Sequence, residues 1–241
     1  MKLSTVFIIA GMMIISLYFL VEVSYHAAAE TKINRTNVPY LEIPSIEIHQ
    51  NINNKSIDHG IYHEPASSKP GLGTVVLSGH RTFFGSPFLN LDRLRKGDNI
   101  TLSWPGIGNV EYNVVKSYVV HASYRLSLEH GKTLFLITCY PLGSTKERLI
   151  IRADQTRIYP FNHASNNKSS SNTPVPYSLL FIGLFLGLGL ILTYLYSVED
   201  DKIIVLIATI ALTLFLIYAY IFPVPPDNIT SHISNINSWF Q

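Results

Sequence analysis

The sequence predicts a mainly β domain, folded as a closed or nearly closed barrel, in a chain that also carries three long apolar segments. Between about residues 39 and 156, short runs rich in β-branched and aromatic residues alternate with turns that contain Gly, Pro, Asn and Ser. Helical periodicity is scarce in this region, and many short strands joined by short turns favour a barrel. Outside it, residues 3–21, 175–198 and 203–226 carry no charged side chain, and each stretch is long enough to span a bilayer core.

The N-terminal segment, residues 1–23, is predicted to be a transmembrane anchor. Lys2 precedes the apolar stretch, which favours a cytoplasmic N-terminus. A cleaved signal peptide is the alternative, because Ala27-Ala28-Ala29 offers an Ala-x-Ala cleavage site. The apolar stretch is longer than the core of a usual signal peptide, so the anchor is preferred. Residues 24–38 then form a short polar stalk, and under both interpretations the domain that follows is exported.

The β domain is predicted to occupy residues 39–156. Its first segment, residues 41–48, alternates apolar and polar side chains around Pro44, as an edge strand does. Residues 51–68 are polar and indicate a loop, with Ile61-Tyr62 as a candidate short strand. A short helix is expected between residues 83 and 95. The other predicted strands are residues 74–77, 99–104, 110–120, 134–138 and 148–152.

The C-terminal region is predicted to be a membrane hairpin. Residues 157–174 form a linker rich in Asn and Ser, without hydrophobic periodicity. The apolar segments 175–198 and 203–226 are separated only by Glu199-Asp200-Asp201-Lys202, so they form a tight pair of transmembrane helices. With the β domain outside, the tail, residues 227–241, is also outside. The chain is thus expected to be a multi-pass protein of the cell membrane, in contact with lipid, whose β domain is extracytoplasmic.

Composition argues against several classes of function. The formal net charge is only +2, which gives no reason to expect a nucleic-acid partner. The single cysteine, Cys139, permits no internal disulfide. The histidines show no metal-ligand spacing and no Gly-rich phosphate loop occurs, so no metal and no other cofactor is expected. Asp58 and Glu64 are candidate calcium ligands in a loop, but two scattered carboxylates are more often simply solvated.

Three residues with complementary chemistry each stand at the end or the start of a predicted strand. The apolar run 133–139 ends on Cys139, another strand leads into Gly79-His80, and Arg148 begins the run that follows the next turn. Cysteine reacts as the thiolate, which a neighbouring cation such as a protonated His80 favours. His80 can act as a base or an acid, and a guanidinium can stabilise an oxyanion. The set therefore predicts a nucleophile, a base and an anion-stabilising group, with an inert buried cysteine as the alternative.

These motifs, in this order, resemble the sortases, a family of cysteine transpeptidases. The family's Thr-Leu-x-Thr-Cys signature stands here as Phe135-Leu136-Ile137-Thr138-Cys139, with Phe135 in place of the first threonine. The family histidine follows a Gly-His step, as in Gly79-His80, and the family arginine opens the strand after the cysteine, where Arg148 lies nine residues past Cys139. Residues 70–73 and 91–98 also resemble the family, and the likeness covers about residues 40–155.

The resemblance implies an eight-stranded barrel and an exported thiol peptidase or transpeptidase of hydrolase type. It implies that Cys139 is the nucleophile, that His80 is the acid and base, and that Arg148 is preferred over Arg152 and Arg81 as the oxyanion or substrate-binding group. Thr138 is expected to support the site or to bind substrate, with ordinary strand packing as the alternative.

The substrates implied by the resemblance are surface proteins or pilins with a C-terminal sorting motif of the Leu-Pro-x-Thr-Gly kind. The acyl group, held as a thioester on the enzyme, would then be transferred to an amine of a cell-wall precursor or of a pilin lysine. This transfer anchors the substrate protein at the cell surface. The sortase subclass stays open, because the chain shares some features with classes C, D and E. Pilin-polymerising sortases often have an Asp-Pro-aromatic lid motif before the barrel and one C-terminal transmembrane helix. This chain has no such motif between residues 24 and 40, and two apolar segments follow its domain. The host is either a Gram-positive bacterium or an archaeon.

Two alternative functions belong to other classes of protein. The first is a sortase-like barrel that binds peptides in assembly without turning them over, which the presence of Cys139, His80 and Arg148 argues against. The second is another exported cysteine peptidase or transpeptidase acting on cell-wall peptides. Such enzymes commonly place an arginine directly after the cysteine, where this chain has Tyr140-Pro141.

Overall fold

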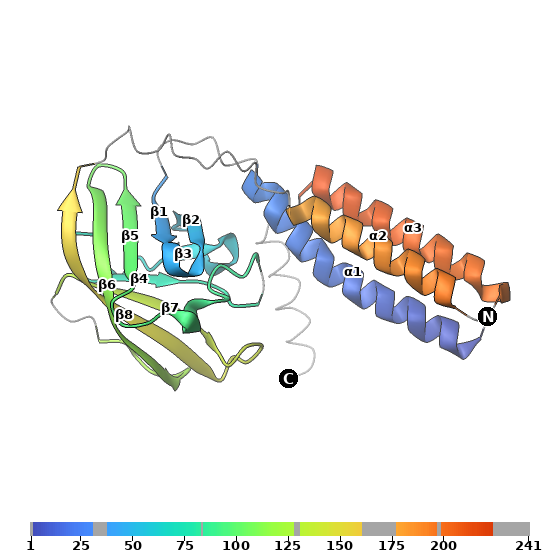
Figure 1. Cartoon of the computed structure of the whole chain (residues 1–241), viewed down its shortest axis with the longest axis horizontal. Helices are drawn as coiled ribbons and strands as arrows, with labels where there is room; N and C mark the ends of the chain where they lie inside the picture. Colours follow the sequence, from blue (N-terminus) through green and yellow to red (C-terminus); the bar gives the residue numbers. More distant parts are fainter. Residues whose placement is uncertain are drawn as a thin grey trace. The chain divides into compact units, whose positions relative to one another are not determined.

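The computed structural model describes residues 2–30, 38–82, 84–127, 131–160, 177–196 and 199–223. The chain divides into two compact units, a β-barrel unit (Arg35–Ser169) and a helical unit (Met1–Asn34 together with Ser170–Gln241), which are drawn in Figure 1. Part of the predicted stalk, most of the predicted linker and the predicted tail fall outside the described residues.

The β-barrel unit is a closed barrel, as the sequence and the family resemblance predicted. Its strands follow one another around the barrel in the order β1-β2-β3-β4-β7-β8-β6-β5. Most neighbouring pairs are antiparallel, whereas β2 with β3 and β4 with β7 are parallel. The strands are β1 (Tyr40–Ile43), β2 (Ile48–Asn53), β3 (Ile61–His63), β4 (Val75–Ser78), β5 (Asn99–Trp104), β6 (Gly108–His121), β7 (Thr133–Tyr140) and β8 (Glu147–Tyr159).

Three details of the strand and helix predictions were wrong. β1 is not an edge strand, because it pairs with β2 on one side and with β5 on the other, and this second pair closes the barrel. β2 extends to Asn53, into the segment predicted to be a loop. The helix expected between residues 83 and 95 is only a 3-10 turn, η3 (Leu91–Arg93); two further 3-10 turns are η1 (Pro44–Ile46) and η2 (Ile57–His59).

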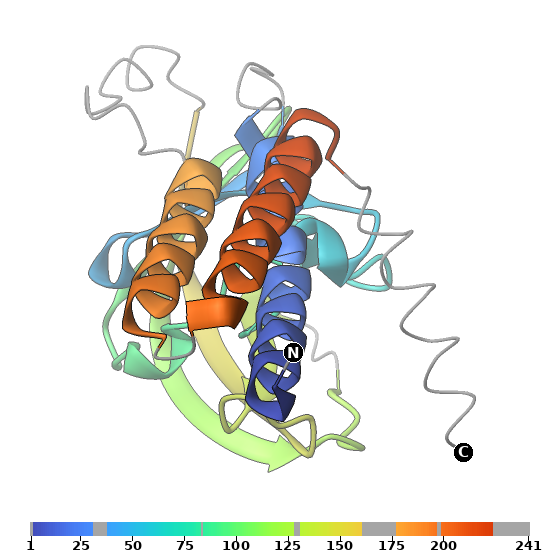
Figure 2. The same cartoon turned by 90° about the vertical axis from the view of Figure 1, so that its right-hand side faces the viewer.

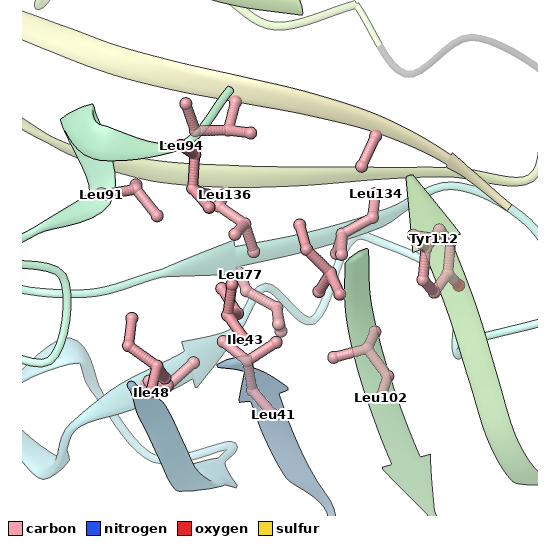
Figure 3. Packing of buried hydrophobic residues seen from close by; sticks show 14 of the residues in the cluster. Leu41, Ile43, Ile48, Leu77, Leu91, Leu94, Leu102, Tyr112, Leu134 and Leu136 are labelled. Atoms are coloured by element: carbon pink, nitrogen blue, oxygen red, sulfur yellow. The ribbon is translucent and has the colours of Figure 1, made fainter. Parts of the chain in front are cut away.

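The barrel interior is filled by apolar side chains from nearly every strand. Leu41, Ile43, Leu77, Leu134 and Leu136 are fully buried there and converge on one another in Figure 3. Each such side chain contributes about 1.5–3 kcal/mol of stabilisation by leaving water. This packing fixes the strands from which the candidate site is built.

β7 carries apolar side chains on both of its faces. Because side chains alternate along a strand, Leu134 and Leu136 point into the barrel while Phe135 and Ile137 point outward. The outward residues belong to a second cluster, here called the outer cluster. It consists of buried Val76, Phe135 and Ile150 with partly buried Tyr118, Val120, Leu126 and Ile137 packed against them.

The helical unit consists of three apolar helices that pack side by side, as Figures 1 and 2 both show. They are α1 (Leu3–Glu30), α2 (Tyr177–Leu195) and α3 (Glu199–Ile221). By length and composition all three can cross a membrane, over Leu3–Ala27, Tyr177–Leu195 and Asp201–Ile221. This agrees with the prediction of one N-terminal and two C-terminal membrane helices.

Close packing and polar contacts join these three helices. Gly189 of α2 lies so near Thr209 of α3 that an added Cβ would clash with the threonine methyl group. At the start of α1, the Lys2 backbone N–H donates to Asp201 Oδ2 at 2.8 Å, and the Thr5 hydroxyl donates to the same carboxylate. The segments predicted as separate anchors therefore form one bundle.

Candidate active site

Cys139 and Arg148 are direct neighbours across two strands. They are register partners in the antiparallel pair β7–β8. Opposite residues of such a pair share a face of the sheet, with Cβ atoms about 4.5–5.5 Å apart. Cys139 is partly exposed, and strand alternation places it on the outward face together with Phe135 and Ile137. The thiol and the guanidinium thus belong to the same side of the barrel wall, beside the outer cluster.

The Gly79-His80 step lies next to the end of β7. In the parallel pair β4–β7, Ser78 is opposite Ile137, so the chain beyond Ser78 runs alongside Thr138 and Cys139. The Gly79 N–H donates to the Ile137 carbonyl at 3.1 Å, and the Thr138 hydroxyl donates to the Gly79 carbonyl at 2.8 Å. Two hydrogen bonds therefore tie the backbone before His80 to the residues that precede the cysteine.

The His80 imidazole is held by a carboxylate and a ring. Its Nε2 lies 2.8 Å from Asp58 Oδ1, and its ring centroid lies 5.4 Å from that of Phe84. The His80 carbonyl accepts the Phe88 N–H at 3.1 Å. The side chains of His80 and Asp58 are 25% and 17% exposed, so water reaches the pair but does not surround it.

Arg148 is oriented by backbone carbonyls of the β7–β8 loop. One of its terminal nitrogens donates to the Thr145 carbonyl at 2.8 Å and to the Glu147 carbonyl at 3.0 Å. Within the part of the chain that the structure describes, no carboxylate pairs with this guanidinium. Its positive charge is therefore available to an anionic or carbonyl oxygen beside Cys139.

The other two arginines considered from the sequence have different surroundings. Arg152 is opposite Phe135 rather than Cys139, and it pairs with Asp154 at 3.5 Å. Four residues along a strand separate it from Arg148, which is about 13 Å at the usual rise. Arg81 is buried, and its guanidinium forms a 2.6 Å ion pair with Asp92. Of the three, only Arg148 is the cross-strand partner of Cys139.

Arg81 has a structural environment of its own beside the site. Its Nε donates to the Leu89 carbonyl at 3.2 Å, and its guanidinium carbon lies 5.5 Å from the centre of the Tyr140 ring. These contacts link the segment after His80 to the residue after Cys139. Arg81 therefore connects the two chain segments that carry the candidate histidine and cysteine.

Sequence reasoning missed Asp58 as part of the site. It was interpreted as a solvated carboxylate or a calcium ligand, but the structure places it on His80. The two residues are 22 positions apart, and no local pattern links them. Among the described residues, no group of three or more His, Cys, Asp and Glu side chains could hold a metal ion. That the site needs no metal stays a prediction.

Comparison with known proteins agrees with the motif reading. Residues 37–156 match the family model of the sortase domain, and the chain belongs to the sortase family. At the level of the family, it is a cysteine transpeptidase, and its three apolar helices fit anchoring in a membrane. No curated protein matches the chain.

Several solved sortase structures are similar to about half of this chain. Sortase A from Corynebacterium diphtheriae is 25% identical, with 54% of this chain and 66% of that chain covered and a TM-score of 0.46. Sortase C-1 from Actinomyces oris is 27% identical, with 55% and 81% covered and a TM-score of 0.46. Sortase C1 from Streptococcus agalactiae is 29% identical, with 52% and 70% covered and a TM-score of 0.45.

Proposed function

We propose that this protein is a membrane-anchored sortase that cleaves a sorting motif near the C-terminus of exported proteins and transfers the acyl group to an amine. Cys139 is the nucleophile, His80 the acid and base, and Arg148 the group that stabilises negative charge on the substrate oxygen. The observation that carries this proposal is the placement of the three residues. Cys139 is opposite Arg148 on β8, and Gly79-His80 runs beside it at the end of β4.

The chemistry proceeds in two acyl transfers. The Cys139 thiolate attacks a backbone carbonyl of the substrate, and the resulting oxyanion faces the Arg148 guanidinium. As the C–N bond breaks, protonated His80 gives its proton to the departing amine and a thioester remains on Cys139. An acceptor amine then attacks the thioester and gives a proton to His80. The new amide leaves, and the thiolate and the imidazolium are restored.

The surface beside the cysteine suits an apolar peptide. The outer cluster continues from Ile137 along β7, on the same face as Cys139. A motif of the Leu-Pro-x-Thr-Gly kind would lay its Leu and Pro side chains against the partly buried members of this cluster and bring the Thr-Gly bond to the thiol. The acceptor is an amine of a cell-wall precursor or of a pilin lysine, and no nucleic acid and no cofactor takes part.

The helical unit supports action at the outer surface of the membrane. Substrates that are themselves held by a membrane tail would meet a tethered enzyme at a raised effective concentration. In this topology the N-terminus and the short α2–α3 connection are cytoplasmic, and the barrel is extracytoplasmic. Protease accessibility of the barrel in intact cells tests this orientation: cleavage within the barrel by external protease is expected, and protection of the barrel with cleavage of the α2–α3 connection would reverse it.

The proposed activity is tested with the full chain in detergent and a quenched fluorescent peptide library built on Leu-Pro-x-Thr-Gly. The wild-type protein is expected to cleave a subset of peptides and to leave a thioacyl adduct on Cys139, visible by mass spectrometry. Cys139→Ala is expected to lose both. Folded wild-type protein that neither turns over nor forms an adduct, yet binds peptides, would instead support a sortase-like binding protein.

A further inference from the structure

The contact between Asp58 and His80 defines a further role at the site. We propose that Asp58 is a positioning residue that accepts the Nε2–H of His80 and so leaves Nδ1 as the nitrogen that exchanges protons with Cys139 and with the amines. The inference rests on the proposed function, because it refines the role given there to His80. It assigns a role to a residue that none of the sequence motifs contains.

Hydrogen-bond chemistry fixes the direction of this contact. An ionised carboxylate only accepts hydrogen bonds, so Nε2, 2.8 Å from Asp58 Oδ1, must carry a hydrogen. In neutral His80 the lone pair then lies on Nδ1, where it can take a proton from the thiol or from the acceptor amine. In protonated His80, Nδ1 carries the proton that passes to the departing amine. In each transfer one proton moves between Nδ1 and its partner, while the hydrogen on Nε2 stays there and is donated to Asp58.

Asp58 is anchored firmly enough to orient a ring. It lies in η2, the turn between β2 and β3, where the Gly60 N–H donates to the Ile57 carbonyl at 3.3 Å. Asn53 braces the start of this turn. Its side-chain oxygen accepts the N–H groups of Lys55 and Ser56 at 2.9 and 3.1 Å, and its side-chain nitrogen donates to the Ile61 carbonyl at 2.9 Å.

The elements near the Asp58–His80 pair carry other charged or titratable groups. Cys139 lies at the end of β7 and Arg148 is opposite it on β8, whereas Phe84 contacts the ring from the segment after β4. His59 is next to Asp58 in η2, and Arg81, the residue after His80, is paired with Asp92. Among the described residues, Asp58 is the carboxylate in contact with the imidazole. Removing its charge should therefore weaken the contact that orients the imidazole.

The first experiment compares Asp58→Asn, Asp58→Glu and His80→Ala in the full chain in detergent. Because Cys139 is the only cysteine, the rate of its alkylation by iodoacetamide against pH reports the thiolate without any peptide substrate. Asp154→Asn is the matched control, since it removes a carboxylate from another part of the barrel. Asp58→Asn is expected to slow alkylation near pH 7 by about tenfold and to move the profile toward higher pH. We expect Asp58→Glu to restore most of the rate and Asp154→Asn to match the wild type.

The outcomes separate the two proposals. A wild-type alkylation profile in His80→Ala would overturn the cysteine–histidine pair itself, and with it the proposed function. A profile that changes in His80→Ala but not in Asp58→Asn would overturn only the role of Asp58. Once a peptide substrate is found, Asp58→Asn is expected to lower kcat by about 10- to 100-fold with little change in KM, as a partial loss of acid–base catalysis does.

The second measurement needs no folded Asp58 variant. Nitrogen NMR of the wild-type chain labelled in histidine distinguishes the two imidazole tautomers, and His80→Gln identifies the signal of this residue among the nine histidines. A neutral His80 that carries its hydrogen on Nε2 is the expected result. Hydrogen on Nδ1 instead would overturn the proposal, whatever the variants show.

Discussion

The hydroxyl of Thr138 offers a sharp test of how the site is held together. It is buried, 2% exposed, and donates to the Gly79 carbonyl at 2.8 Å, directly before His80. Thr138→Val keeps the shape of the side chain but removes this hydrogen bond. Leaving a buried carbonyl without its partner costs about 1–3 kcal/mol. The added apolar burial offsets about 0.8 kcal/mol, the usual value for one methylene group.

The expected net loss in the free energy of unfolding is therefore about 0.2–2.2 kcal/mol, obtained from these two terms. For a domain of this size it lowers Tm by about 1–9 °C. A shift of the freed Gly79-His80 backbone should also lower kcat by about tenfold or more, because small displacements of catalytic groups are costly. The measurements are thermal unfolding by circular dichroism and turnover of the peptide found in the library screen.

Thr138→Ser is the matched control, because it retains the hydroxyl and loses only a methyl group. Deleting one buried methyl costs about 0.5–1.5 kcal/mol, so the two variants should lose similar stability. Only Thr138→Val should lose kcat. Equal loss of kcat in both variants would show that packing of Thr138, and not its hydrogen bond to Gly79, positions the histidine.

Two further predictions use matched pairs that the chain itself provides. Arg148→Ala is expected to lower kcat by about 10²–10³-fold, the usual effect of losing one oxyanion donor. Arg152→Ala should lower kcat by less than tenfold. Equal losses of kcat in the two variants would contradict the choice of Arg148 over Arg152. In the helical unit, Gly189→Ala forces a contact with Thr209 and is expected to cost about 1–3 kcal/mol, measured by thermal unfolding in detergent. Gly187→Ala, whose added Cβ meets nothing within 4 Å, should be neutral or slightly stabilising, and indistinguishable stabilities would refute the close packing of α2 against α3.

Strand alternation explains why so much of the barrel could be predicted. The strand over residues 99–104 was predicted with the bounds of β5, and residues 134–138 lie within β7. In both, the pattern is a local property of a few consecutive side chains. The same pattern does not say which strand lies beside which. The closing pair β1–β5 joins segments about 60 residues apart, so β1 looked like an edge.

The sequence by itself determined the class of fold, the three membrane-length segments and the three candidate residues, because strand ends, apolar length and short motifs are written in neighbouring positions. Only the tertiary structure decided that Arg148, and not Arg152, is opposite Cys139, since that depends on the register of β7 and β8. It alone brought Asp58 to His80, because the connection between β2 and β3 meets the end of β4 only through the pairing of β3 with both β2 and β4.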